Sequence, residues 1–525
     1  MSAAADGPAA PWWRGAVVYQ IYPRSFADAS GNGVGDLAGC RRHLAYVASL
    51  GVDAIWLSPF FTSPMRDFGY DVSDYCGVDP CFGTLADFDA LLNDAHRLGL
   101  RVIIDQVYSH TSDEHPWFVE SRASADNARA DWYVWCDPRA DGTPPNNWQS
   151  VFGGPAWTWD ARRRQYYLHH FLASQPALNL HLPAVQDAVL DVARFWLARG
   201  VDGFRLDALN FALHDPQLRD DPPASAAQRA LATRPFDFQQ HRFSMSHPDI
   251  PRFLERIRET TDGFAGRFTV AEVVGPDALA EMQAFTEGDR RLDSAYGFDF
   301  LYADALTPAL VRNALGAWPG AVGEGWPSFA FSNHDAPRVV SRWCPPQVDS
   351  AHFARLLLLL LCSLRGNAFL YQGEELGLPA ARVPFARLRD PEAIANWPAT
   401  LGRDSARTPM PWRHDAPHFG FSAGEPWLPA DPAHAPLAVD LQTQDPTSVL
   451  HFTRRLLTCR RQVSALRTGA LRFLDTGADE LLAFERSHGA GERVICCFNL
   501  SAETRPLPLP DLAACRLLAA VEAGA

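Results

Sequence analysis

The sequence lacks an excess of positive charge. Lysine and arginine together number 47, against 61 aspartate and glutamate residues, which gives a formal net charge of −14. A chain with this balance has no general positive field to attract a phosphate backbone. We therefore expect no nucleic acid among its partners.

The sequence also lacks long apolar runs and regularly spaced cysteines. Its longest apolar run, around Leu356–Leu361, is far shorter than the roughly 20 residues of a bilayer span. The first 20 residues contain no basic start followed by an apolar stretch, and the ten cysteines include no C-x-x-C pair. These absences predict a cytoplasmic, soluble protein with reduced thiols and no contact with a membrane.

What the chain does contain is typical of a large globular protein. Of its 525 residues, 47% are hydrophobic and 21% are charged, which is ample for a large core. There are 16 Trp, 12 Tyr and 32 Phe residues. Such flat rings suit the faces of sugars as well as protein cores, and we expect most of them in the core.

Short apolar segments rich in β-branched and aromatic residues alternate with stretches of helical spacing. One such stretch begins at Thr84, which forms a capping-box pattern with Asp87 and precedes an apolar face of Leu85, Phe88, Leu91, Leu92, Ala95 and Leu98. A pattern in which a strand is followed by a helix, repeated eight times, predicts an α/β fold, namely the parallel (β/α)8 TIM barrel. The predicted strands are Val17–Phe26, Ala54–Phe60, Arg101–His110, Gly203–Ala208, Phe268–Val274, Ser294–Phe300, Ser328–Asp335 and Ala368–Leu376.

Two parts of the chain depart from a plain barrel. Residues 111–175 are rich in Gly, Pro, Trp and Asn, and are predicted to form an excursion domain after the third strand. After a last helix near Leu450–Arg467, alternating strands such as Glu480–Glu485 and Arg493–Asn499 predict a small C-terminal β-domain over residues 468–525. Residues 1–110 and 176–467 are then the barrel.

Polar residues cluster where the predicted strands end. Barrel enzymes carry their active sites at the C-terminal ends of the strands, and a single acid there is more often a loop cap or an ion-pair partner. Four acids that converge with an arginine and two histidines are a much stronger signal of catalysis. The residues predicted at this rim are Asp105, His110, Arg205, Asp207, Glu272, His334 and Asp335.

Four short motifs give the chain a family resemblance. In order they are DQVYSH (Asp105–His110), GFRLDA (Gly203–Ala208), AEVV (Ala271–Val274) and SNHD (Ser332–Asp335), supported by QIYPRSF, DFGYDVSDY, QPALN and GRDSARTPMPW. Together they resemble glycoside hydrolase family 13, the α-amylase family, and most closely its bacterial exo-acting α-glucosidases of the oligo-1,6-glucosidase group. The resemblance covers nearly the whole chain.

The resemblance implies the roles of the acids. Asp207 corresponds to the nucleophile, Glu272 to the general acid/base, and Asp335 to a third carboxylate that holds sugar hydroxyls. A retaining mechanism of this kind requires the two reacting carboxyl groups to lie about 5 to 5.5 Å apart. Arg205, two residues before Asp207 on the same strand, points to the same side and is expected to keep the nucleophile ionised.

The resemblance also implies a substrate pocket. Asp67 and Arg403 correspond to a pair that closes its end, Tyr70 to a ring that stacks on the first glucose, and His110 and His334 to hydroxyl donors. Phe152 and Phe171 match aromatic positions that line the pocket, and plain packing is an equally good interpretation of both. Ala208 matches a position associated with linkage choice, where alanine accompanies α-1,4 rather than α-1,6 bonds; the alternative is packing beneath the rim.

The loop DASGNGVGD is a candidate cation site. Related enzymes bind a divalent cation with the pattern DxNxDxxxD, to which Asp28, Ser30, Asn32, Val34 and Asp36 correspond here. Hard cations prefer several oxygens, charged ones above all, and three of these five are weak ligands. A structural Ca2+ or Mg2+ and a metal-free turn held by Asn32 remain equal alternatives. The chemistry itself requires no cofactor.

The resulting hypothesis is a retaining exo-α-glucosidase that releases glucose from short maltose-type α-glucosides, with transglucosylation to alcohol or sugar acceptors. A sucrose isomerase or a trehalose synthase-type isomerase is the alternative, because it uses the same acids and the same covalent intermediate. A non-catalytic scaffold is a third hypothesis, which the presence of all three acids disfavours.

Overall fold

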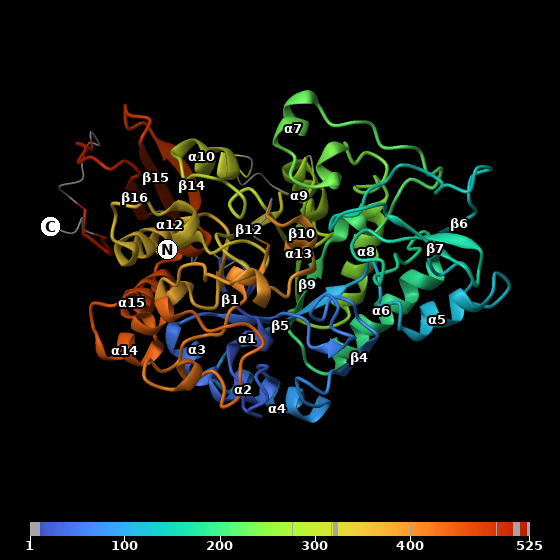
Figure 1. The fold of residues 1–525 in the computed structure, drawn as a ribbon. Helices are drawn as coiled ribbons and strands as arrows, with labels where there is room; N and C mark the ends of the chain where they lie inside the picture. The colour runs from blue at the N-terminus through green and yellow to red at the C-terminus, as the bar shows by residue number, and fades with distance from the viewer. Residues whose placement is uncertain are drawn as a thin grey trace.

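The computed structural model describes residues 11–275, 277–316, 318, 324–398, 402–489, 491–507 and 515–521. At its centre, eight parallel strands close into a barrel (Figure 1), and each overlaps one of the predicted segments. The predicted (β/α)8 fold is therefore confirmed. The barrel strands are β1 (Val17–Ile21), β2 (Ala54–Leu57), β5 (Arg101–Val107), β9 (Gly203–Asp207), β10 (Phe268–Val273), β11 (Ser294–Gly297), β12 (Trp326–Ala330) and β13 (Asn367–Tyr371).

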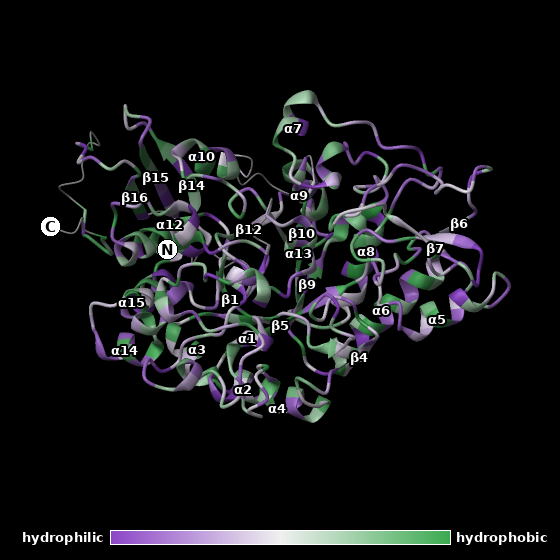
Figure 2. Cartoon of the chain, viewed as in Figure 1, coloured by the Kyte–Doolittle hydropathy of each residue, from purple (hydrophilic) through white to green (hydrophobic). Residues whose placement is uncertain are grey.

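Helices cover the outside of the barrel and turn their apolar faces inward, so that they carry both hydrophobic and hydrophilic stretches in Figure 2. They are α2 (Leu37–Arg42), α3 (Leu44–Leu50), α4 (Leu85–Arg97), α6 (Pro183–Ala198), α8 (Ile250–Asp262), α9 (Ala278–Thr286), α10 (Pro308–Gly316), α12 (Ser350–Ser363) and α15 (Val449–Gln462). Over the described part of the chain, no helix is both long and apolar enough to cross a bilayer.

Helix α4 shows how local sequence sets an element. The predicted capping box is present: the Thr84 hydroxyl accepts from the Asp87 N–H, and Asp87 accepts from the Thr84 N–H. Of the predicted apolar face, Phe88, Leu91, Leu92 and Ala95 are buried. The prediction is wrong for Leu98, which is 44% exposed, because the helix ends at Arg97 and the chain turns.

Antiparallel sheets lie on two sides of the barrel (Figure 1). One, with strand order β6 (Trp135–Cys136), β8 (Gln165–Leu168), β7 (Trp157–Asp160), falls within the predicted excursion, beside α5 (Pro116–Ala123). The other comprises β14 (Ala470–Leu474), β15 (Leu481–His488) and β16 (Glu492–Asn499), within the predicted C-terminal β-domain. Strands β3 (Phe61–Thr62) and β4 (Asp74–Val78) form a separate pair.

Two more long segments leave the C-terminal rim, over residues 208–249 after β9 and 372–448 after β13, and the sequence patterns predict no separate domain for either. They contain short helices and turns, whose brief apolar patterns carry little periodicity. The remaining helices in the described ranges are α1 (Pro23–Phe26), α7 (Ala226–Leu231), α11 (Val339–Trp343), α13 (Pro391–Asn396), α14 (Val439–Gln444) and α16 (Ser464–Thr468), with 3-10 turns at Leu209–Phe211, Pro235–Phe238, Glu374–Leu376, Phe385–Arg387, Asp404–Ala406, Pro417–Gly420 and Pro432–Leu437.

A buried arginine on α15 joins several of these parts. Arg460 is 1% exposed, and its guanidinium donates to the backbone carbonyls of Cys362, Leu466, Gly15 and Gly366. These carbonyls belong to α12, α16, and the segments that lead into β1 and β13. Arg460 thus satisfies polar groups that would otherwise be buried without partners.

Replacing Arg460 by Gln should lower the apparent melting temperature by at least about 5 °C, because several buried carbonyls lose a charged donor at once. Differential scanning fluorimetry measures the shift. The matched control is Arg455→Gln on the same helix, where the exposed side chain donates to a single carbonyl, that of Pro446. Equal shifts for the two variants would contradict the anchoring role of Arg460.

Candidate active site

Strand register brings the first group of acids together. In the parallel pair β5–β9, Asp105 lies opposite Arg205, and in β9–β10, Ala271 lies opposite Leu206. Side chains alternate along a strand, so Arg205 and Asp207 share one face. One residue beyond Ala271, Glu272 lies level with Asp207. The C-terminal ends of three neighbouring strands therefore present these side chains to the same point.

The guanidinium of Arg205 is the centre of this group. It is fully buried (0% exposed), and one terminal nitrogen lies 2.7 Å from Asp105 and also contacts Asp207. The other terminal nitrogen contacts Glu272, while Nε donates to the Tyr296 hydroxyl at 3.0 Å. Tyr296 in turn donates to Glu272 at 3.1 Å. Asp207 and Glu272 are thus both attached to a single rigid cation.

Burial controls the protonation of these acids. It raises the pKa of Asp207 and of Glu272 well above their ordinary values, and the attraction of Arg205 only partly offsets it. Asp105 is affected in the same way. The contact predicted between Arg205 and Asp207 is present, but it does not lower the pKa of that carboxyl below its ordinary value. The two acids therefore hold a proton between them at higher pH than free carboxyls do.

Asp335 has the opposite environment. Its Oδ1 lies 2.7 Å from Arg407, and its Oδ2 lies 3.2 Å from the ring of His334. Burial opposes ionisation here too, but the neighbouring His334, Arg407 and Arg403 outweigh it and hold the pKa of Asp335 well below its ordinary value. Asp335 is therefore a permanent carboxylate beside a pair of acids that titrate higher.

The pair predicted to close the pocket is in contact. Arg403 Nη2 lies 2.8 Å from Asp67 Oδ1 and 2.8 Å from Asp390 Oδ1, and all three side chains are buried. The Gln175 amide donates to the other oxygen of Asp67 at 3.1 Å. The guanidinium also lies 4.9 Å from the ring centre of Phe152. This pair joins the loop between β3 and β4 to the segment after β13.

The other predicted binding residues contact one another and the groups already described. Tyr70 lies parallel to His334 with ring centres 5.4 Å apart, and its hydroxyl is 2.6 Å from His334 Nε2. The ring of His110 is 5.3 Å from that of Phe171, which is 5.6 Å from Phe152. Every predicted residue of the pocket is therefore connected to the same cluster.

The position of Ala208 differs from the prediction that it belongs to the fourth barrel strand. Strand β9 ends at Asp207, and Ala208 has left-handed backbone angles (φ 44°, ψ 44°). The turn aims its N–H at Glu272 Oε2, 3.3 Å away. The chain thus leaves the barrel directly after Asp207. The methyl group is buried against Phe211 and Met245.

Comparison with known proteins supplies the family. The model of the α-amylase catalytic domain matches residues 20–469. The chain belongs to the α-amylase family. Family 13 membership, expected from the four motifs, is thereby confirmed, and the chain is a glycoside hydrolase of that family.

Several relatives within the α-amylase family match along nearly their whole length. A probable α-glucosidase of Rhizobium meliloti is 53% identical over 96% of this chain and 92% of its own length. An oligo-1,6-glucosidase of Parageobacillus thermoglucosidasius is 36% identical, with 95% and 92% covered. The crystal structure of the α-glucosyl transfer enzyme XgtA has a TM-score of 0.91 at 53% identity, with 94% and 92% covered.

The sequence patterns do not predict four side chains that contact the predicted site residues: Tyr296, Asp390, Arg407 and Gln175. Gln175 and Arg407 lie inside quoted motifs, so closer attention to QPALN and GRDSARTPMPW could have found them. Asp390 gave no signal, since it lies in an irregular segment and meets Arg403 only in the folded chain.

The predicted cation loop is held by hydrogen bonds. Asp28 accepts from the N–H groups of Gly31 and Gly33 and from Ser422, and Asp36 accepts from the N–H groups of Ala29 and Ser30. Asn32 accepts from the N–H of Val34. A Ca2+ or Mg2+ ion would compete with these donors. The metal site therefore stays a prediction, weakened by the occupied carboxylates.

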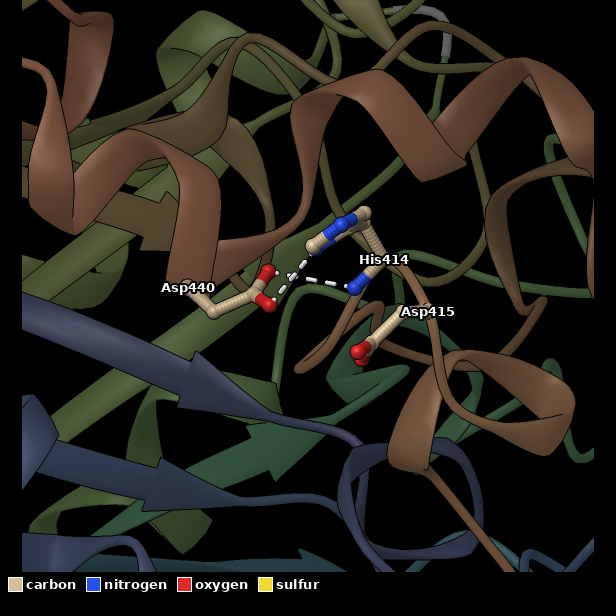
Figure 3. A group of neighbouring side chains, drawn as sticks. All are labelled: His414, Asp415 and Asp440. Carbon is tan, nitrogen blue, oxygen red and sulfur yellow. Dashed lines mark hydrogen bonds and ion pairs between the residues drawn. The ribbon is translucent and has the colours of Figure 1, made fainter.

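A second group of possible ligand types lies elsewhere on the surface (Figure 3), where His414 Nδ1 contacts Asp440 at 2.8 Å, with Asp415 nearby. His414 and Asp415 are exposed, and within the described ranges neither they nor Asp440 contact the acids at the rim. A hydrogen bond between His414 and Asp440 accounts for the group.

Replacing Arg205 by Gln should make stability depend more strongly on pH. Without the cation, the carboxyls of Asp105, Asp207 and Glu272 have folded-state pKa values still further above the unfolded values of about 4. Stability from such raised groups is present at low pH and is lost as pH rises through the folded pKa. The melting-temperature difference from the wild-type chain should therefore grow from pH 5 to pH 8.

Scanning fluorimetry at both pH values measures this difference. Arg455→Gln, which touches no carboxylate among the described residues, is the control and should show a difference independent of pH. A deficit for Arg205→Gln that is the same at pH 5 and pH 8 would show that Arg205 does not offset the charge of these acids.

Proposed function

We propose that this protein is a retaining exo-α-glucosidase that acts on short α-glucosides and also transfers glucose to sugar or alcohol acceptors. The observation that carries the proposal is the placement of Asp207 and Glu272, level with each other on adjacent strands and attached to one guanidinium. Adjacent strands lie about 4.8 Å apart. This spacing suits the separation of about 5 to 5.5 Å that a retaining pair needs.

In the proposed reaction, a carboxylate oxygen of Asp207 attacks the anomeric carbon while Glu272 gives its proton to the departing glycosidic oxygen. A glucosyl ester forms on Asp207, and the aglycone leaves with the proton. Glu272, now ionised, takes a proton from water or from an acceptor hydroxyl, whose oxygen attacks the same carbon and breaks the ester. Both groups return to their starting protonation states, and no cofactor takes part.

The environment of each acid supports its role. The raised pKa of Glu272 keeps a proton available for the leaving group. When Glu272 carries that proton, it is neutral and no longer repels a negative charge on Asp207. The attraction of Arg205 then favours the ionised form of Asp207. Asp335, held ionised by its arginine neighbours, is proposed to accept hydrogen bonds from sugar hydroxyls.

Exo action is proposed from the contact of Asp67 with Arg403. The two charges meet and link two rim segments, an arrangement that would block a chain from extending past the first sugar. Tyr70 and His110 are proposed to contact that sugar, which their position beside the pair supports. Phe152 and Phe171 would form the apolar wall.

Transfer and isomerisation use the same intermediate, so the acceptor decides the product. The similar structure XgtA is described as an α-glucosyl transfer enzyme, and a further match, MutB from Pseudomonas mesoacidophila MX-45, as a trehalulose synthase with 34% identity and a TM-score of 0.86. Product analysis on maltose and sucrose separates the cases. Net release of glucose supports the proposal, whereas a rearranged disaccharide without hydrolysis supports the isomerase.

Asp207→Asn should lower kcat for 4-nitrophenyl α-glucoside by more than about 10³-fold and leave the melting temperature near that of the wild-type chain, because it removes the nucleophile without changing volume. Glu272→Gln should lose maltose hydrolysis but still form the ester from the aryl glucoside, whose leaving group needs no proton. Burst kinetics measure the latter. Near-normal turnover by a pure Asp207→Asn sample would exclude Asp207 as the nucleophile.

The preference for α-1,4 over α-1,6 bonds is the finer part of the proposal and depends on Ala208. Its methyl group is buried beside Phe211 and its N–H reaches Glu272, so a larger side chain here would change the space next to the leaving group. A change of one or two carbons in a pocket is worth only about 1 to 3 kcal/mol. The preference should therefore be strong without being absolute.

We predict that kcat/KM for maltose exceeds that for isomaltose by at least about tenfold, and that Ala208→Val raises the isomaltose-to-maltose ratio. Since valine is strained in left-handed backbone, both constants should also fall. Ala208→Gly, which keeps the backbone angles and adds no bulk, is the control. Equal kcat/KM values for the two disaccharides in the unmodified enzyme would show that Ala208 does not set linkage choice.

A further inference from the structure

A cavity of about 620 Å³ opens at the N-terminal end of the barrel, opposite to the rim that carries the acids. Its walls come from the segment before β1, the chain leading into β2 and β5, and the end of α15 with α16. Small-molecule sites commonly have volumes of about 300 to 1,000 Å³. The proposed reaction makes no use of it.

The charge of this cavity is opposite to that of the chain as a whole. Four arginines line it, Arg14, Arg101, Arg461 and Arg467, together with one carboxylate, Asp53. The whole chain has a net charge of −14. Because the sequence contains no lysine, all 47 basic residues are arginine, and the use of arginine is not itself informative. The informative feature is the shortage of acids around these four arginines.

Two of the arginines have only shared or distant acidic partners. Arg467 lies 3.7 Å from Asp53. Arg101 lies 2.9 Å from Asp202, which also pairs with His96 at 2.6 Å. Asp53 is thus too distant for a close ion pair with Arg467, and Asp202 is shared between Arg101 and His96. Both guanidinium groups therefore keep N–H donors that could bind another anion.

The other two arginines pair with no carboxylate among the described residues. Arg14 lies over the ring of Trp326 at 4.5 Å, and Arg365, which lies 3.8 Å from Glu324, is near the same ring at 4.7 Å. Burial lowers the pKa of Arg14. Arg461 donates to the backbone carbonyl of Gly51 at 2.9 Å. An anion in the cavity would supply the acidic partner that Arg14 and Arg461 have in none of the described carboxylates.

An aromatic ring forms part of the cavity wall. The indole nitrogen of Trp12 donates to the carbonyl of Gly266 at 2.7 Å, and its ring packs edge-to-face on Phe268 at 5.9 Å. The indole is thus fixed in orientation and only partly buried. A flat ring beside guanidinium groups matches a ligand with a sugar-like part and a charged part.

We propose that this cavity binds a small phosphate monoester dianion, with Arg14, Arg461 and Arg467 on the phosphate oxygens and Trp12 beside the organic part. Guanidinium groups suit phosphate because their paired N–H donors match its oxygens. The ligand would connect the N-terminal segment to α16, which packs on β15 and β16. It would therefore stabilise the attachment of the C-terminal sheet to the barrel.

Isothermal titration calorimetry on the full chain, in low salt near pH 7.5, tests the proposal with inorganic phosphate, glucose 6-phosphate and uncharged glucose as probes. The variants are Arg14→Gln and Arg461→Gln, and the matched control is Arg252→Gln, an exposed arginine on α8 that lies outside the cavity. Circular dichroism and maltose hydrolysis show whether each variant is folded, and neither should change in Arg14→Gln.

The expected result is saturable 1:1 binding of a phosphate-bearing probe that weakens at least tenfold in Arg14→Gln and Arg461→Gln and is unchanged in Arg252→Gln. Tighter binding of glucose 6-phosphate than of phosphate supports a monoester with its organic part beside Trp12, and equal binding of the two would overturn that assignment. The absence of saturable binding, or glucose 6-phosphate binding that survives Arg14→Gln, would overturn the proposal. Neither result depends on the proposed glucosidase activity.

Discussion

The rest of the rim depends on the ion pairs that one buried guanidinium, that of Arg205, makes with several acids. Removing Arg205 from water is costly, and the contacts with Asp105, Asp207 and Glu272 compensate for that cost. The acids in turn are tolerable in a buried site only because the guanidinium is there. Neither partner is stable alone, so the barrel mouth holds them as a unit whose geometry follows from strand register.

This unit separates the carboxyls into two kinds. Asp207 and Glu272 face a single shared cation and titrate above their ordinary range, whereas Asp335 faces Arg407 and Arg403 and stays ionised. Paired acids with raised pKa values suit proton transfer, and a fixed carboxylate suits the binding of hydroxyl groups. Arg403 also pairs with Asp67 and Asp390, so the ion pair that links the two rim segments and the charge of Asp335 share one guanidinium.

Much of this arrangement was predictable from local sequence, and the exceptions have physical causes. Buried parallel strands read as apolar runs, and the motif residues at their ends follow from where the strands stop, which is why Asp207 and Glu272 were found. Asp390 meets Arg403 only because a long irregular segment folds back over the rim. The left-handed turn at Ala208 and the exposure of Leu98 depend on where the strand and the helix end, and boundaries are poorly encoded in local patterns.

The central claim is that Asp207 and Glu272 act as a retaining pair through a covalent ester. Proton NMR of glucose released from 4-nitrophenyl α-glucoside, recorded within the first minutes before mutarotation equilibrates the anomers, tests it most directly. The account predicts that α-glucose appears first and β-glucose grows in only by mutarotation. Initial release of β-glucose would contradict it, because inversion requires a water molecule between more widely separated carboxyl groups.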